Sequence, residues 1–287
     1  MVDPMGRHLD GGQIGRRQFV ASCAAGAVLA GRFAHAATAP LKATAIDHIS
    51  YESKDYKKTR DFYVALFGFQ VSEEDDRQLY LWAGTSLLSA KNTPAAAVPS
   101  IDHFGVTVDP WDAPAVATAL QERGMMGQFI RNDPHDPQGR SAFTRDADGF
   151  TLQLDPKDLV TRPAAVVSAA PLRAVALHHI SYACPDYAKT RDFYRDFLGA
   201  RVTNDDGHQA DVWFGDIYMA IRTTADGGSR PTVDRVAWTV ADWDSQRVSA
   251  VLTQHSLEVQ AAVDGESILT RDLNGYPLEL CSGRKRR

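Results

Sequence analysis

The sequence predicts an α+β fold built from four similar modules, and an internal repeat carries this prediction. Residues 46–91 align without a gap on residues 177–222 at an offset of 131, with 14 identities in the first 26 positions. Because an internal repeat fixes the architecture before any finer pattern is read, the two copies indicate two related domains. Whatever differs between the copies is therefore as informative as what they share.

A shorter repeat lies inside each copy. His48 recurs as His103 after 55 residues, and His179 is followed after 56 residues by Arg235 at the matching position. Each of these residues stands in a strand-like run. We therefore expect four modules of about 55 residues that each open on a strand.

The modules that open each copy indicate a strand, a helix and then further strands. Asp55 is expected to cap a helix that Gly68 ends, and Asp186 and Gly199 take these places in the second copy, around aromatic residues at helical spacing. Each copy closes with a predicted hairpin, because an Asp-Gly or Asn-Gly pair stands between apolar runs. The other predicted strands are 78–82, 86–90, 151–154, 209–213, 217–221 and 277–280.

The first 36 residues are expected to be an export signal and not part of the fold. Arg16 and Arg17 precede an Ala- and Gly-rich apolar run, and a small-x-small site ends at Ala36, which predicts a twin-arginine signal peptide over 1–36. The twin-arginine translocase would then be a partner, and the mature protein would be periplasmic or secreted. The run is too short for a stable membrane anchor; lipidation at Cys23 is the other alternative.

Composition argues against one class of partner. Removing four arginines and two aspartates with the signal leaves 27 basic and 34 acidic residues, a net charge near −7, which disfavours nucleic acid. Whether Cys184 and Cys281 pair stays open, as does the oligomeric state. The remaining chain is long enough for two domains, which we expect at 44–156 and 174–282. We expect a linker between them at 157–173 and a basic tail at 283–287.

The module order, the strand histidines and the closing pattern together resemble one family. The pattern D-x-[DN]-G-x-x-x-[EQ]-[LI] ends both copies, at 146–154 and 272–280. The chain resembles the vicinal oxygen chelate superfamily, which includes glyoxalase I, bleomycin-resistance proteins and extradiol ring-cleaving dioxygenases, from residue 44 to residue 281. The resemblance implies tandem βαβββ modules that pair into two half-open β cups, each able to hold a divalent metal.

Carried over position by position, the resemblance implies a metal site in the first domain. Its ligands would be His48, His103 and Gln153, and imidazole with an amide oxygen suits zinc, iron(II), manganese or nickel. Ring-cleaving relatives use two histidines and a carboxylate, so the amide is expected to weaken the site. The alternative is that both histidines are satisfied core residues.

The equivalent positions of the second domain are His179, Arg235 and Glu279. An arginine stays protonated and cannot donate a lone pair to a metal. We therefore expect Arg235 to pair with Glu279 in the place of the cation, and the second cup to hold no metal. By strand alternation, His178 should face away from His179.

Other residues carry weaker indications. Trp82 and Trp213 are candidates for lining a substrate site, or they fill the cups by packing. The loop at 132–140, with His135, makes the first domain six residues longer than the second at this point. Such a loop can act as a lid or be a tolerated insertion.

Three functions remain open from the sequence. The first is an exported metalloenzyme of lyase or isomerase type that acts on a small vicinal-oxygen substrate. The second is an extradiol ring-cleaving dioxygenase, and the third is a metal-free protein that binds or sequesters an aromatic ligand. Glyoxalase I itself is disfavoured, because its thiol cofactor belongs to the cytoplasm. Fold alone does not separate these functions.

Overall fold

The computed structural model describes residues 41–93, 99–129, 136, 138–157, 159–164, 168–224, 228, 230–262 and 264–284. The predicted signal peptide, with Arg16 and Arg17, lies outside the described residues, as does His135. Residues 39–287 form one compact unit. Among the described residues, no helix has both the length and the apolar character that crossing a bilayer requires.

The first sheet and its two helices span residues 43–156. Their elements are β1 (Ala43–Ser53), α1 (Tyr56–Phe67), β2 (Gln70–Glu74), β3 (Gln78–Ala83), β4 (Ser86–Asn92), β5 (Ser100–Val108), α2 (Ala113–Glu122), β6 (Gln128–Phe129), β7 (Ala142–Arg145) and β8 (Thr151–Pro156).

The second sheet and its helices span residues 174–281. Their elements are β9 (Ala174–Cys184), α3 (Tyr187–Leu198), β10 (Arg201–Thr203), β11 (Gln209–Phe214), β12 (Ile217–Thr223), β13 (Thr232–Val240), α4 (Ser245–Gln254), β14 (Gln260–Ala261), β15 (Ser267–Arg271) and β16 (Pro277–Cys281).

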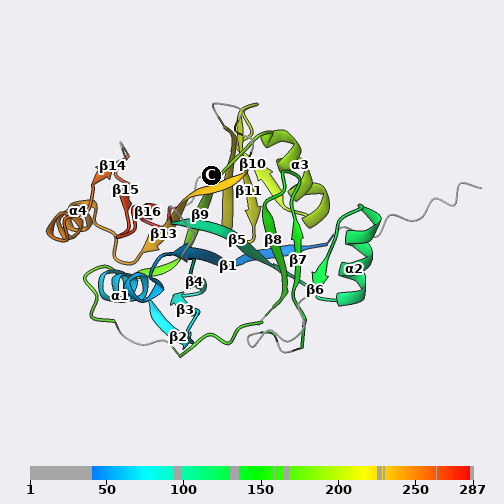
Figure 1. Ribbon diagram of the computed structural model, residues 1–287. Coiled ribbons are helices and arrows are strands. Elements are labelled where there is room, and N and C mark those ends of the chain that lie inside the picture. Colours follow the sequence, from blue (N-terminus) through cyan, green and yellow to red (C-terminus); the bar gives the residue numbers. More distant parts are fainter. Residues whose placement is uncertain are drawn as a thin grey trace, which may run out of the picture. The chain divides into compact units, whose positions relative to one another are not determined.

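The two eight-stranded sheets have the same strand order (Figure 1). It is β2-β3-β4-β1-β5-β8-β7-β6 in the first sheet and β10-β11-β12-β9-β13-β16-β15-β14 in the second. The first strands of two modules run antiparallel at the centre of each sheet, and each has the last strand of its own module beside it in parallel. The predicted α+β fold of four βαβββ modules is confirmed.

The two long helices begin and end where their capping residues predict. The Asp55 side chain accepts hydrogen bonds from the backbone N–H groups of Lys57 and Lys58, and α1 ends at Gly68 with φ 69°. Asp186 and Gly199, with φ 65°, do the same for α3. Only glycine adopts this left-handed conformation at little cost, so both helices stop at the same point of the repeat.

A β-bulge stands directly before His48 in the first domain and directly before His179 in the second. The register of β1 against β5 shifts between Ile46 and His48, so Asp47 is an extra residue, and a matching shift in β9 makes His178 the extra residue before His179. A bulge breaks strict alternation. The expectation that His178 faces away from His179 is therefore wrong, because their Nδ1 atoms are 2.8 Å apart.

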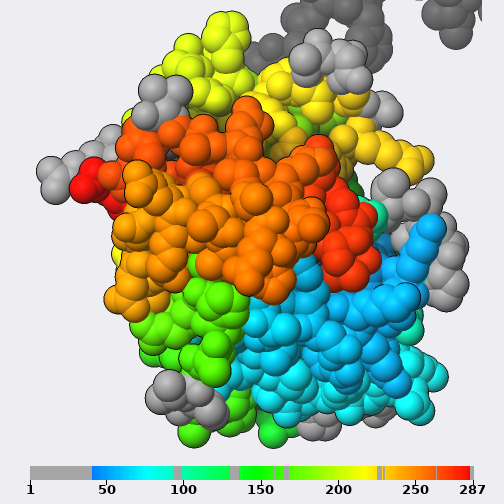
Figure 2. All heavy atoms as spheres, turned by 90° about the vertical axis from the view of Figure 1, so that its left-hand side faces the viewer, coloured from blue at the N-terminus to red at the C-terminus, as the bar shows by residue number. Residues whose placement is uncertain are grey.

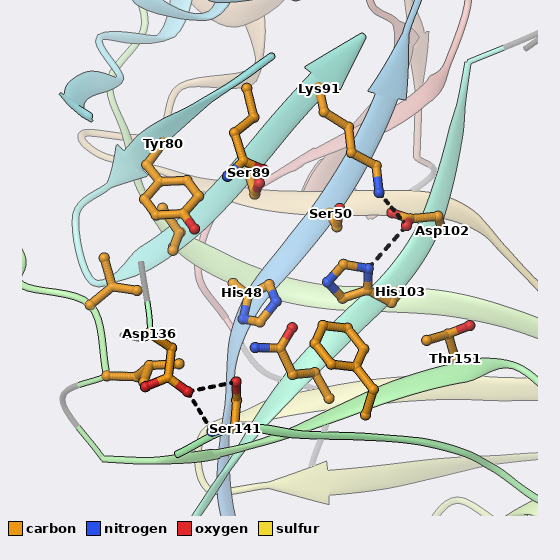
Figure 3. A pocket seen from close by; sticks show the side chains of 16 residues that line it. His48, Ser50, Tyr80, Ser89, Lys91, Asp102, His103, Asp136, Ser141 and Thr151 are labelled. Atoms are coloured by element: carbon orange, nitrogen blue, oxygen red, sulfur yellow. Dashed lines mark hydrogen bonds and ion pairs between the residues drawn. The ribbon is translucent and has the colours of Figure 1, made fainter. Parts of the chain in front are cut away.

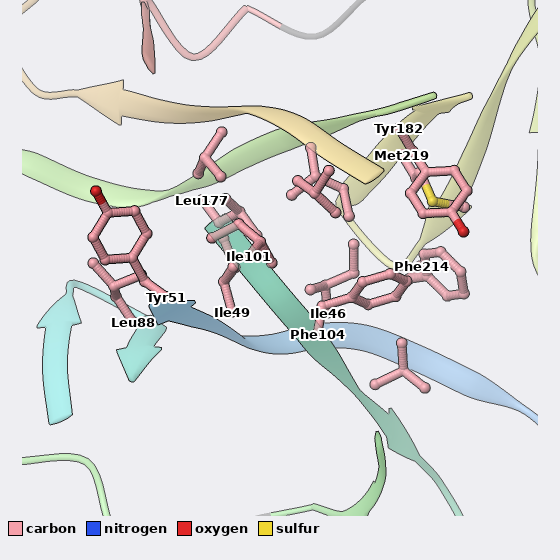
Figure 4. Packing of buried hydrophobic residues seen from close by; sticks show 14 of the residues in the cluster. Ile46, Ile49, Tyr51, Leu88, Ile101, Phe104, Leu177, Tyr182, Phe214 and Met219 are labelled. Atoms are coloured by element: carbon pink, nitrogen blue, oxygen red, sulfur yellow. The ribbon is translucent and has the colours of Figure 1, made fainter. Parts of the chain in front are cut away.

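The two sheets share one hydrophobic core (Figure 4). Ile49 and Phe104 of the first sheet and Leu177 and Phe214 of the second belong to the same buried cluster, and each is at most 1% exposed. Burial of such side chains on both sheets stabilises the pairing of the domains.

A polar cluster also joins the sheets. Asp272, in the last hairpin of the second domain, accepts hydrogen bonds from the hydroxyls of Tyr51, at 2.6 Å, and Tyr63, at 3.3 Å, and Asn274 donates to Tyr51 at 3.1 Å. Figure 2 shows the fourth module, in orange and red, directly against the first module, in blue and cyan. This hairpin therefore fastens the second domain to the first.

The repeat produces the same cluster a second time. Asp146, in the last hairpin of the first domain, accepts from the hydroxyls of Tyr182, at 2.5 Å, and Tyr194, at 2.9 Å. Burial raises the pKa of both Asp146 and Asp272, although the hydrogen bonds to each carboxylate oppose that effect. Two buried carboxylates thus tie the domains together reciprocally.

Candidate functional site

A cavity of about 280 Å³ lies over the central strands of the first sheet (Figure 3). His48 of β1, His103 of β5 and Gln153 of β8 all line it, although 55 and 50 residues separate them along the chain. The two imidazole rings lie nearly perpendicular, with centroids 5.3 Å apart. The structure therefore brings together all three residues predicted as metal ligands.

Two carboxylates hold the His48 ring from its Nδ1 side. Nδ1 is 2.6 Å from Asp47 Oδ1 and 3.5 Å from Asp155 Oδ2. The Thr107 hydroxyl donates to the other Asp47 oxygen at 2.9 Å. Because a carboxylate accepts the Nδ1 proton, the lone pair of the neutral ring lies on Nε2.

His103 is held in the same way. Its Nδ1 lies 3.1 Å from Asp102 Oδ2, and Lys91 Nζ donates to that oxygen at 2.6 Å, as the dashed lines in Figure 3 show. Lys91 and His103 both lower the pKa of Asp102 against the effect of burial, so this carboxylate stays ionised. His103 Nε2 is thus the second nitrogen whose lone pair is available to a metal.

Asp155 also orients Gln153. The Gln153 amide nitrogen donates to Asp155 Oδ1 at 2.9 Å, which leaves the amide oxygen as the third donor. Asp155 Oδ2 is buried and receives no hydrogen bond from the described residues, although it is 3.5 Å from His48 Nδ1. Asp155 thereby orients Gln153 by a hydrogen bond and lies next to the His48 ring.

The charges around His48 favour a cation. Burial lowers the pKa of His48, but Asp47, Asp155 and Asp102 outweigh burial and raise it, whereas burial dominates at His103 and lowers its pKa. Burial and the neighbouring Asp47 raise the pKa of Asp155 well above its usual range. Positive charge at this place relieves the repulsion between the two carboxylates.

Gly105 provides the space that the His48 ring occupies. A Cβ atom at Gly105 would lie 2.2 Å from His48 Cε1 and 2.5 Å from Asp47 Oδ1. No side chain other than hydrogen fits here while the ring keeps its place. The cavity, the three oriented donors and this recess together fit a divalent metal bound by two imidazoles and one amide oxygen.

Comparison with known families agrees with this geometry. The model of the Glyoxalase/Bleomycin resistance protein/Dioxygenase superfamily matches residues 45–154 and 176–237, which is more than half of the chain. The chain belongs to this superfamily. The first matched segment includes all three donors of the first domain, and the second includes His179 and Arg235.

Individual members of the superfamily are similar to parts or most of the chain. Metallothiol transferase FosB from Staphylococcus epidermidis and from Staphylococcus haemolyticus is 27% identical over 115 residues, which cover 37% of this chain and 83% of each relative. The Mn(II)-bound glyoxalase from Novosphingobium aromaticivorans superimposes with a TM-score of 0.69 at 16% identity, over 85% of this chain and 84% of that chain.

An extradiol ring-cleaving dioxygenase from B. fuscum superimposes with a TM-score of 0.66 at 20% identity, over 86% of this chain and 75% of that chain. At these identities the two structures show the shared fold of the superfamily. The activity of this chain has to be argued from its own residues.

The second cup differs from the first as the sequence predicts. Arg235 Nε lies 2.9 Å from Glu279 Oε2, and His179 Nε2 lies 3.4 Å from the same oxygen. Burial alone would raise the pKa of Glu279, but His179 and Arg235 lower it to about 2. The Arg235 side chain is 35% exposed and its Nε–H does not point at the carboxylate, so this ion pair is weaker than a fully buried one.

The two tryptophans proposed to line a substrate site lie outside the 280 Å³ cavity. Trp82 donates its Nε1 proton to Ser72 Oγ at 3.0 Å and lines an adjoining, larger cavity of about 1010 Å³, which shares His48 with the first. Trp213 donates to Thr203 Oγ1 at 2.7 Å and lies against Tyr218. Neither tryptophan lines the 280 Å³ cavity.

Sequence reasoning missed the carboxylates that support the site. Asp47 and Asp102 directly precede the two histidines, so the repeated Asp-His pair was the available signal, and a bulge makes the first of them effective. Asp136, inside the extra loop of the first domain, is 2% exposed, lines the cavity, and accepts hydrogen bonds from the Ser141 backbone and hydroxyl at 2.7 and 3.0 Å. Asp136 therefore supplies part of the cavity wall.

Proposed function

We propose that the first domain binds one divalent metal ion and that the protein is a metal-dependent lyase or isomerase for a small substrate with vicinal oxygens. The metal would be held by His48 Nε2, His103 Nε2 and Gln153 Oε1. The observation that carries the proposal is the orientation of all three side chains: a carboxylate accepts the N–H of each one, which leaves its lone pair for a metal.

The donor set favours Lewis-acid chemistry. All three donors are neutral, and the supporting carboxylates of Asp47, Asp102 and Asp155 contact the ligands on their other side. When bound, the ion would polarise the two oxygens of the substrate and stabilise negative charge that develops on them. A cavity of about 280 Å³ suits a small substrate.

Asp136 is the residue that we propose to accept a proton from the substrate. Its carboxylate lies on the wall of the same cavity, where Ser141 donates two hydrogen bonds to Oδ2 and Arg140 Nε lies 3.4 Å from Oδ1. A positioned carboxylate can act as a general base beside a Lewis acid. Asp136→Asn should then lower kcat while the metal content of the protein stays the same.

The names of the relatives support a metal enzyme. One superimposable structure is described as an Mn(II)-bound glyoxalase, and two similar sequences are named metallothiol transferases. The extradiol alternative also has structural relatives, but the His-His-carboxylate set of that class is incomplete in both domains of this chain. For this reason we place a reaction without oxygen first.

The proposal is tested with metal-free protein reloaded with manganese, iron(II), nickel or zinc. α-Hydroxy carbonyl compounds and catechols are offered as substrates, and product formation and oxygen uptake are followed together. We expect turnover of an α-hydroxy carbonyl compound without oxygen uptake, and loss of turnover in His103→Ala. Oxygen uptake with a catechol would instead show that the protein is a dioxygenase.

The second candidate function is binding of an aromatic ligand without metal. The cavity of about 1010 Å³ favours it, because Trp82, Phe214 and the linker residues Leu159 and Val160 line that space. An apolar cavity of this size can hold a planar ligand. Saturable binding of aromatic compounds by metal-free protein, weakened in Trp82→Ala, would support this function.

We also propose that the protein is exported by the twin-arginine route and acts in the periplasm or outside the cell. The support is the sequence alone: Arg16 and Arg17 before an apolar run and a small-x-small site that ends at Ala36. This route would carry the chain after folding, with its metal already in place.

A further inference from the structure

We infer that the second domain holds a separate metal site for a soft cation such as zinc or copper(I), formed by His178, His179 and Cys281. The site lies on the Nδ1 side of His179, opposite the side that faces the cup. It is independent of the function proposed for the first domain, because the two sites share no residue.

The three side chains form a compact and buried group. Their ligand atoms all lie within 4.8 Å of one another, and His178, His179 and Cys281 are 3%, 5% and 4% exposed. A tetrahedral zinc ion places two nitrogens about 3.4 Å apart and a nitrogen and a sulfur about 3.6 Å apart, given zinc–ligand distances of about 2.0–2.1 and 2.3 Å. Small side-chain rotations therefore bring the group to the geometry of a metal site.

The hydrogen bonds of the two imidazoles indicate a cation between them. His179 Nε2 lies 3.4 Å from the Glu279 carboxylate, and His178 Nε2 lies 3.2 Å from the backbone carbonyl of Arg284. The Arg284 carbonyl only accepts, so His178 Nε2 carries a proton and the lone pair of the neutral His178 ring lies on Nδ1. That Nδ1 atom lies 2.8 Å from His179 Nδ1, so a proton or a metal ion lies between the two rings.

That cation is either a shared proton or a metal ion, and Cys281 decides in favour of a metal. A thiolate beside two imidazoles is a donor set that zinc and copper(I) prefer. The Glu279 carboxylate behind His179 is the partner that metal-binding histidines commonly have on their other nitrogen. Leu177 and Gly283, adjacent in sequence to His178 and Arg284, line the cavity of about 1010 Å³.

The repeat explains why the two domains differ. The residues equivalent to His178, His179 and Cys281 in the first domain are Asp47, His48 and Asp155, and they too form a buried or half-buried group. There the carboxylates take the proton of Nδ1 and direct Nε2 into the cup. In the second domain the Glu279 carboxylate lies on the Nε2 side of His179, at 3.4 Å, and the group that can hold a metal lies on the Nδ1 side.

Titration of the full chain with cobalt(II), under reducing conditions and without oxygen, tests this site. A cobalt ion bound to a thiolate absorbs strongly in the near ultraviolet, whereas one bound only by nitrogen and oxygen does not. With cobalt in excess, we expect the absorption of one thiolate-bound cobalt per chain in the wild type and in the control variants Cys23→Ser and Cys184→Ser. Cys184 is the matched control, because it is also buried and not in a disulfide.

The absorption should disappear in Cys281→Ser, and Cys281→Ala repeats the test if serine disturbs the strand. His178→Gln keeps the thiol but removes one proposed ligand. It should weaken zinc binding at least about 10- to 100-fold, because replacing only a residue that hydrogen-bonds to a metal ligand already costs that much. The double variant His48→Ala/His103→Ala should keep the absorption, which separates this site from the first cup. Absence of the absorption in the wild type, or its persistence in both Cys281 variants, would overturn the inference.

Discussion

Replacing Gly105 by alanine tests the recess that positions His48. The new Cβ would lie 2.2 Å from His48 Cε1 and 2.3 Å from its Nδ1, whereas non-bonded carbons in good contact are about 3.5–4.0 Å apart. The ring therefore has to retreat by more than about 1 Å. Metal sites tolerate deviations of only about 0.2 Å in ligand distance. Gly105→Ala should thus lose the metal of the first cup.

The same substitution should lower the stability of the metal-free protein. Forcing an extra methyl group into a filled space costs about 1–3 kcal/mol. In a His48→Ala background only the flexible end of the Asp47 side chain remains close to the new Cβ, at 2.5 Å, so Gly105→Ala should cost clearly less than in the wild type. Equilibrium unfolding in urea of the four proteins of this cycle measures the coupling between the two positions.

The second domain supplies the control. Ala237 pairs with His179 as Gly105 pairs with His48, so an alanine is already present at the equivalent position. Ala237→Gly should leave the metal content of the first cup unchanged. An equal cost of Gly105→Ala with and without the His48 ring, or full metal content in Gly105→Ala, would refute the role given to this recess.

Four further predictions concern the domain contacts, a buried carboxylate, the second cup and export. Tyr51→Phe and Tyr182→Phe should each cost about 1–3 kcal/mol in urea unfolding, because each leaves a buried carboxylate with one donor fewer; a cost in only one of them would contradict the equivalence of the clusters. Burial raises the pKa of Asp272 in the folded protein above the ordinary value of 3.8. Between the pKa of the unfolded chain and the pKa of the folded protein, the native state therefore binds more protons than the unfolded chain. The free energy of unfolding should therefore fall as pH rises through that window, and Asp272→Asn should remove this part of the fall. In a Cys281→Ser background, which frees His179 from the site on its Nδ1 side, Arg235→His should complete a three-ligand set in the second cup and add about one zinc per chain, whereas no gain in zinc would show that the arginine does not stand in the place of the cation. Replacing the paired arginines near the N-terminus with lysine should keep the precursor inside the cell, as cell fractionation and N-terminal sequencing would show; a processed chain that begins at Ala37 in the periplasm would contradict this.

Much of the fold follows from local signals in the sequence. Asp55 and Gly68 define the first helix, and the repeat transfers that result to the second domain. The donors His48, His103 and Gln153 could be found because each sits at the same place in a repeated module. Periodicity and repeats therefore determine which residues face the cup.

The supporting residues were harder to predict, for a physical reason. A bulge before His48 places Asp47 beside the His48 ring. The equivalent bulge of the second domain places His178 beside His179, whereas strict alternation predicts that the two side chains lie on opposite faces of the strand. A bulge arises from pairing between distant strands and leaves no local pattern. The contact of Asp272 with Tyr51 is equally hidden, because the hairpin sequence encodes its own turn and not the surface that it meets.

The metal content of the double variant His48→Ala/His103→Ala tests the central claim most directly. It is best measured by elemental analysis in a Cys281→Ser background, so that a metal in the second domain does not contribute. The reference protein with Cys281→Ser alone should carry about one divalent metal ion per chain, and the variant that also lacks both histidines should carry none. Equal metal content in the two proteins would contradict a metal site in the first cup.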